Sequence, residues 1–189
     1  MLSASFDVAG LSAHFDRLNE AIGTGVRVAA QAGAQVFYDE VKLRAAKNRK
    51  SGRLADSIYQ KFVPELSTEG LSARYHISWR KSYMGEEKVG GLVSAPHGQL
   101  IEYGWYQRYV MGKVDGKYTG PMVRPEKVGT PKPKRRASQA EKDAYWIPLP
   151  TPIKHAPKSF LRSSYEAKKA EAVQAAVDAM QEHVARAFL

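Results

Sequence analysis

The side chains with catalytic or metal-binding potential are scattered along the chain. The five histidines share no ligand spacing. Gly85 and the pair Gly90-Gly91 lack the Gly-Lys-Ser/Thr that completes a phosphate-binding loop. Glu86 and Glu87 are adjacent, and adjacent side chains point apart on a strand or a helix. The histidines are His14, His76, His97, His155 and His183. We therefore expect no enzyme, no metal site and no cofactor.

Composition sets the broad class. A chain of 189 residues is long enough for one domain with a real core. The chain holds no cysteine, which excludes disulfides and thiolate metal sites. No apolar run approaches the ~20 residues of a membrane span, and residues 1–10 lack the pattern of a signal peptide. These features predict a protein that is made in the cytoplasm and does not enter a membrane.

Two long amphipathic helices are predicted, one at each end of the chain. Apolar residues recur at spacings of three, four and seven over residues 11–46 and again over residues 161–188. The first stripe includes Leu11, Phe15, Leu18, Ile22, Ala29 and Gly33, and the second includes Tyr165, Ala172, Val173, Ala176, Val177 and Met180. A helix of this length needs a long partner, so the two helices are expected to pack together. The small residues at 28–34 allow a close approach.

Strand signals lie between the helices. Residues 58–63, 71–79, 97–103 and 146–150 have the apolar content of short strands, and residues 53–59 favour a short helix before the first of them. The predicted fold is α+β: a small antiparallel sheet packed by the N-terminal and C-terminal helices. We expect residues 1–189 to form a single domain, with residues 104–145 as an extended basic insertion.

This insertion carries most of the net charge of +10. Residues 108–136 hold nine Lys and Arg residues against two acids, a net charge of +7. No periodicity is visible there, and a structureless loop of such length is either functional or disordered. We interpret it as an arm that becomes ordered against a neighbouring molecule. Solubility alone is the simpler explanation of the charge.

Three short motifs, in order, resemble those of a phage protein family. Residues 48–58 read NRKSGRLADSI, residues 102–104 read EYG, and residues 157–164 read PKSFLRSS. The motifs and their placement between two helices resemble the head–tail joining family of tailed bacteriophages, the tail-completion or neck proteins and minor tail components. The resemblance covers residues 10–104 and 146–189. The insertion departs from the family pattern, as do a missing threonine and a missing second proline.

The resemblance implies a structural protein of the virion, an α+β subunit that forms a ring around the DNA channel between portal and tail tube. The expected ring is a hexamer, made in the host cytoplasm and located in the neck or tail. Its partners would be further copies of itself, the neighbouring neck, portal-side and tail-tube or terminator proteins, and, transiently, the double-stranded genome. A tail terminator is an alternative station, since terminators are also small α+β ring subunits.

Nine residues are the candidates for these contacts. Those expected at subunit interfaces are Arg53, Glu102, Tyr103, Phe160 and Arg162. Those expected in the arm or the DNA channel are Lys132, Lys134, Arg135 and Arg136. For any one of the charged residues, an ordinary surface ion pair of ~0–1 kcal/mol is an equally simple role.

A second hypothesis uses the same basic segment differently. The insertion is rich in tyrosines and cations, which suits a monomeric protein that uses residues 108–136 to bind DNA or RNA along the backbone and stacks bases on its aromatic rings. The two hypotheses are distinguished by mass and by salt. A ring subunit assembles, whereas a monomeric binding protein holds nucleic acid with an affinity that falls steeply with salt.

Overall fold

The computed structural model describes residues 8–47, 52–81, 88–89 and 92–189. The chain divides into two compact units. The first unit is Met1–Gly98 with Ser159–Leu189, and the second unit is Gln99–Lys158. The predicted insertion at residues 104–145 falls within the second unit. The sequence features at residues 48–51, 85–87 and 90–91 lie outside the described residues.

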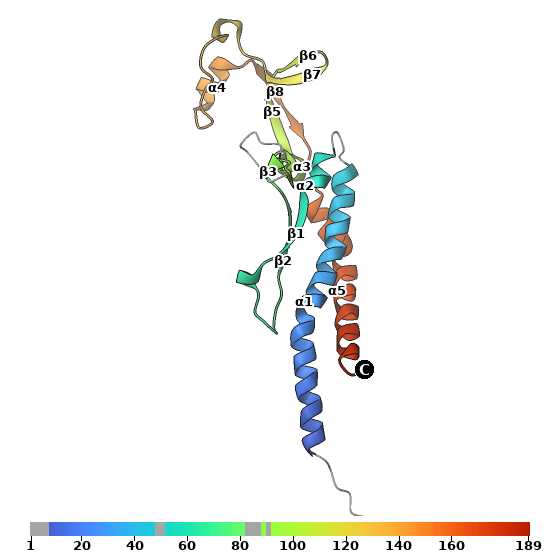
Figure 1. The fold of residues 1–189 in the computed structure, drawn as a ribbon. Coiled ribbons are helices and arrows are strands. Elements are labelled where there is room, and N and C mark those ends of the chain that lie inside the picture. Colours follow the sequence, from blue (N-terminus) through green and yellow to red (C-terminus); the bar gives the residue numbers. More distant parts are fainter. Residues whose placement is uncertain (1–7, 48–51, 82–87, 90–91) are drawn as a thin grey trace, which may run out of the picture. The chain divides into compact units, whose positions relative to one another are not determined.

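A pair of long helices dominates the first unit (Figure 1). Helix α1 spans Val8–Lys47 and helix α5 spans Leu161–Arg186, and the two pack together along their lengths. Both predicted helices and their pairing are therefore confirmed. The lengths differ, however, because α1 has 40 residues and α5 has 26. The N-terminal part of α1 consequently extends beyond the end of α5 (Figure 1).

Small residues form the contact surface between α1 and α5, which we call the helix seam. Ala21, Gly25, Ala29 and Gly33 recur every four residues on α1 and are all buried. A Cβ atom added to Gly33 would lie 2.9 Å from the carbonyl oxygen of Ala172, closer than real Cβ contacts. The glycines thus allow the two backbones to approach, as the small residues at 28–34 predicted.

A hairpin packs on α1. Helix α2 (Arg53–Ser57) leads into strand β1 (Ile58–Phe62), which pairs antiparallel with β2 (Tyr75–Trp79). Between the strands lies the 3-10 helix η1 (Pro64–Leu66). The strand predicted over residues 71–79 begins later than expected, because its first residues belong to the turn closed by the Thr68–Ser72 bridge. A short ladder of β3 (Lys88–Val89) and β4 (Leu92–Val93) follows.

The large core side chains of the first unit gather beside α2. The rings of Trp79 and Phe160 meet edge to face with centroids 5.5 Å apart. Phe160 is 0% exposed and Trp79 is 4% exposed, with Leu54 and Ile58 buried as well. This cluster anchors the chain immediately before α5 begins.

The second unit contains more regular structure than the sequence predicted, and its strand β8 overlaps the strand expected over residues 146–150. Strand β5 (Trp105–Tyr109) pairs antiparallel with β8 (Pro148–His155), and β6 (Met111–Val114) pairs antiparallel with β7 (Lys117–Pro121). The 3-10 helix η2 spans Pro125–Lys127, and helix α4 spans Gln139–Tyr145. The extended basic insertion expected over residues 104–145 thus contains strands and short helices of its own. Most of these strand residues are partly or fully exposed, so no apolar–polar alternation marked them.

The strand predicted over residues 97–103 is instead helix α3, Gly98–Tyr103. Gly104 follows it with φ 74°, the left-handed conformation that commonly ends a helix at glycine. A Cβ atom there would lie 2.6 Å from the carbonyl oxygen of His155, so only glycine fits without displacing β8. The short apolar pair before it does not by itself distinguish a helix from a strand.

The fold is α+β, with long N- and C-terminal helices packed together and small antiparallel two-stranded sheets. The sequence had predicted one small sheet. In the described residues each strand has a single partner, so every sheet is only two strands wide. None of the described helices is long and apolar enough to cross a membrane.

Candidate interaction surfaces

Two of the five predicted interface residues are buried. Phe160, which was expected at a subunit interface, lies in the core of the first unit against Trp79. Glu102 is 1% exposed and has a partner within the chain. It ends helix α3 together with Tyr103, whereas the sequence had placed both at the end of a strand. Tyr103 is 60% exposed.

The two predicted interface arginines lie on helix starts in the first unit. Arg53 is the first residue of α2 and Arg162 the second of α5, and both side chains are exposed. Each also interacts within the chain. Arg53 has an electrostatic effect on His97: partial burial lowers the pKa of His97, and the positive charge of Arg53 lowers it further.

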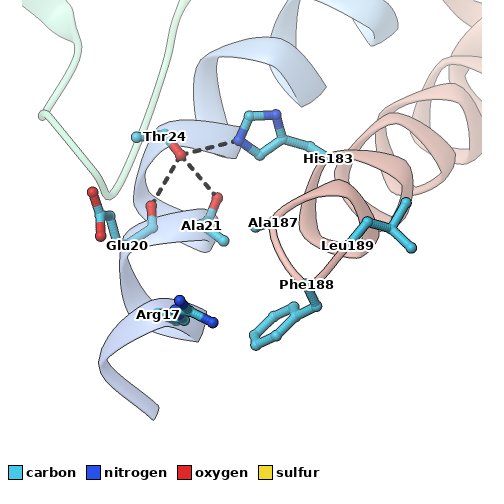
Figure 2. Close-up of a pocket in the computed structure, with 8 residues that line it drawn as sticks. All are labelled: Arg17, Glu20, Ala21, Thr24, His183, Ala187, Phe188 and Leu189. Atoms are coloured by element: carbon cyan, nitrogen blue, oxygen red, sulfur yellow. Dashed lines mark hydrogen bonds between the residues drawn. The ribbon is translucent and has the colours of Figure 1, made fainter. Parts of the chain in front are cut away.

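No catalytic constellation appears in the described part of the chain. It contains no group of three or more His, Cys, Asp or Glu residues that could hold a metal ion. A groove of about 470 Å³ lies between α1 and the end of α5. Figure 2 shows the Thr24 hydroxyl there, 3.0 Å from Nε2 of His183 and within hydrogen-bonding distance of the carbonyl oxygens of Glu20 and Ala21. These contacts join the two helices.

The groove marks the place where α5 stops covering α1. Phe188, two residues beyond α5, stacks on His14 with ring centroids 6.0 Å apart. Residues 8–13 of α1 extend past this contact. We call Leu11, Phe15, Leu18 and Ile22 the uncovered stripe, because these apolar residues recur at spacings of four, three and four on α1 beside the buried line of Ala21 and Gly25; Leu11, Phe15 and Ile22 are 47%, 57% and 41% exposed.

Helix α5 exposes apolar residues too. Val173 is 64% exposed and Val177 is 42% exposed, one turn apart on α5. The seam uses their neighbours Ala172 and Ala176, which face Gly33. On α5, the large side chains of Val173 and Val177 thus remain in solvent, while the small side chains of Ala172 and Ala176 form the helix seam. Exposed apolar patches of this kind commonly mark sites of protein association.

The second unit has a different surface, formed by residues 127–136, which we call the basic loop. It contains the predicted candidates Lys132, Lys134, Arg135 and Arg136 together with Lys127, and all five side chains are exposed. The loop has no acidic residue. The four cations predicted to lie in the arm or the DNA channel are thus exposed on one short segment.

Helix α4 holds the end of this loop. Ser138 and Glu141 form a capping box: the Ser138 hydroxyl accepts a hydrogen bond from the Glu141 amide, and the Ser138 amide donates to the Glu141 carboxylate. The Ser138 amide and then the Ser138 hydroxyl, both donating to the Glu141 carboxylate, lower the pKa of Glu141. The helix was missed in the sequence, although Ser-Gln-Ala-Glu at residues 138–141 matches the capping-box pattern.

The β6–β7 hairpin was also missed. Its turn is Asp115-Gly116, with φ 50° and 74°, and positive φ at both central residues defines the tight turn that Asp-Gly favours. The hairpin is open to solvent: Val114 is 60% and Tyr118 62% exposed, and Lys113 Nζ lies 4.9 Å from the centroid of the Tyr118 ring.

Comparison of the chain with protein-family models, with curated proteins and with solved structures found no match.

Proposed function

We propose that this chain is a structural subunit of a ring in the neck of a tailed phage, where it completes the tail around the DNA channel. The motifs at residues 48–58, 102–104 and 157–164 supply the phage context. The proposed ring is a hexamer that contacts the neighbouring portal-side and tail-tube proteins in the virion, after synthesis in the host cytoplasm. A tail terminator is the alternative station.

The observation that carries the proposal is the uncovered stripe on α1. Fully burying a large apolar side chain contributes about 1.5–3 kcal/mol, and three of the stripe's four side chains are about half exposed. Covering them with a second copy would therefore stabilise an assembly by several kcal/mol. This face differs from the exposed face of α5 at Val173 and Val177. Contact between two different faces of identical subunits is heterologous, and it closes into a ring when the rotation allows.

A pair of matched variants tests the interface. Phe15 and Leu66 are each 57% exposed in the chain, but Leu66 belongs to η1 and lies off the stripe. Phe15→Ser should weaken assembly by about 1–2 kcal/mol per contact, roughly tenfold in concentration. Leu66→Ser should leave assembly unchanged. The readout is the concentration at which sedimentation velocity shows rings dissociating; equal effects of both variants would refute the role of the stripe.

The alternative is a monomeric nucleic-acid-binding protein, and the exposed basic loop favours it. Electron microscopy separates the two functions. A ring subunit should give particles with a central opening in the absence of nucleic acid. A field of monomers without DNA, together with tight DNA binding at moderate salt, would favour the alternative.

A further inference from the structure

We propose that the basic loop binds the phosphate backbone of nucleic acid without reading its sequence. The proposal concerns residues 127–136 of the second unit and does not depend on assembly into a ring. The partner of the cations is the row of phosphates, and the interaction is an electrostatic contact along the nucleic-acid backbone.

The cations of the loop are available for such a contact. None of the five forms an ion pair with any residue that the structure describes. By contrast, Lys168 and Lys169 on α5 pair with Glu171 and Glu166. Four of the loop's cations fall within residues 132–136, and this segment has no regular secondary structure. The loop thus combines exposed side chains with a high local density of positive charge.

The acids that flank the loop in sequence are engaged elsewhere. Glu126, next to Lys127, lies 4.0 Å from the guanidinium of Arg124. Asp143 accepts hydrogen bonds from the Tyr109 hydroxyl at 2.9 Å and from the Gln139 amide at 2.7 Å. Glu141 caps α4 through Ser138. The second unit as a whole has twelve Lys and Arg residues against five Asp and Glu residues, a net charge of +7 over residues 99–158. Its field therefore attracts polyanions.

The backbone of the loop is held in place before any ligand arrives. The Tyr145 hydroxyl donates to the carbonyl oxygen of Thr130 at 3.0 Å, and the Lys142 ammonium donates to that of Arg135 at 3.0 Å. The Ala137 amide donates to the carbonyl oxygen of Lys134 at 2.9 Å. An ordered loop loses less conformational entropy on binding, so the cations are positioned for contact at a lower entropic cost.

Phosphate fits this surface better than a folded acidic protein does. Charges on a nucleic-acid strand repeat about every 3.4 Å along the helix axis, so a dense run of cations can meet several phosphates at once. The guanidinium groups of Arg135 and Arg136 suit two-pronged contacts with phosphate oxygens. The loop offers only Val128 as a large apolar side chain that could anchor a protein partner. No element of the loop is shaped to read bases, so the contact is independent of sequence.

The test measures affinity for a fluorescent 20-base-pair duplex and for its single strand over a series of salt concentrations. Each phosphate contact contributes a slope of about −0.9 in log K against log salt for duplex DNA. Arg135→Gln with Arg136→Gln should reduce the slope by about 1.8 and weaken binding on the order of tenfold to a hundredfold at 0.1 M salt. Lys168→Gln with Lys169→Gln removes the same charge from α5 and serves as the control.

Each outcome decides the proposal. Loss of affinity in the loop variant and not in the control supports it, and the stronger of the duplex and single-strand signals identifies the form bound. Equal affinity of the two variants, or absence of binding to either probe at low salt, overturns it. Binding of polyglutamate as tightly as DNA would also overturn it, since the surface would then recognise only negative charge. Light scattering on the same samples reports assembly separately, so failure of the ring and failure of this proposal are distinguishable.

Discussion

Two glycines on α1 allow the helix seam to be tested with a matched pair of substitutions. Replacing a helical glycine by alanine stabilises a helix by about 0.8–1 kcal/mol where space exists. A Cβ atom at Gly23 has its nearest neighbour, the Cα of Gly70, at 3.6 Å, which is ordinary contact. At Gly33 the new Cβ lies 2.9 Å from the carbonyl oxygen of Ala172, a backbone atom of α5 that cannot move by a side-chain rotation.

The two substitutions should change the free energy of unfolding differently. Gly23→Ala should raise the free energy of unfolding by about 0.8–1 kcal/mol. Gly33→Ala gains the same helix propensity and loses about 1–3 kcal/mol to overpacking, so it should be neutral or destabilising. The two variants should therefore differ by about 1–3 kcal/mol.

The assay is urea unfolding followed by far-UV circular dichroism, at one protein concentration because association shifts apparent stability. The midpoint should move up for Gly23→Ala and not for Gly33→Ala, with an unchanged m-value. If Gly33→Ala stabilised the chain as much as Gly23→Ala, α5 would not lie against Gly33, and the close helix pairing would be refuted.

Two further predictions concern the first unit. Phe160→Ala should lower the free energy of unfolding by about 3–5 kcal/mol, because the ring is 0% exposed against Trp79; a loss below about 1 kcal/mol in urea unfolding would contradict its place in the core. Arg53→Gln should raise the pKa of His97 part of the way toward 6.5 in an NMR titration, since burial is the larger cause of the lowering and remains. Because the folded pKa lies below the unfolded one, His97 lowers stability as the pH falls below about 6.5; no change in its pKa in the variant would contradict the proximity of Arg53.

The long helices could be predicted because their signal is local and repeated. The stripes beginning at Leu11 and at Tyr165 place one apolar residue on each turn, and this period alone specifies a helix. The sequence did not reveal how much of each stripe is covered. Phe15 stays exposed although the neighbouring His14 stacks on Phe188, and which side of α1 meets α5 is a property of the packed pair.

The second unit resisted prediction for a physical reason. Its strands are short and none of their side chains is buried, with Val114 60% and Tyr118 62% exposed, so no strand carries a row of buried apolar residues. Local signals were present in Asp115-Gly116 and in the Ser138 capping box, and these turn and cap patterns would have identified the hairpin and α4. The burial of Phe160 could not be predicted from a local pattern, because it depends on packing against Trp79, which is distant in the sequence.

The most direct test of the proposed function is the molar mass of the native protein by light scattering, at low and moderate salt, with and without a short DNA duplex. If the chain forms the proposed hexameric ring, we expect one discrete species of about six times the 21.0 kDa chain mass that forms without DNA. A 21.0 kDa monomer at every concentration, gaining mass only when the duplex is added, would contradict the ring and favour a monomeric nucleic-acid-binding protein.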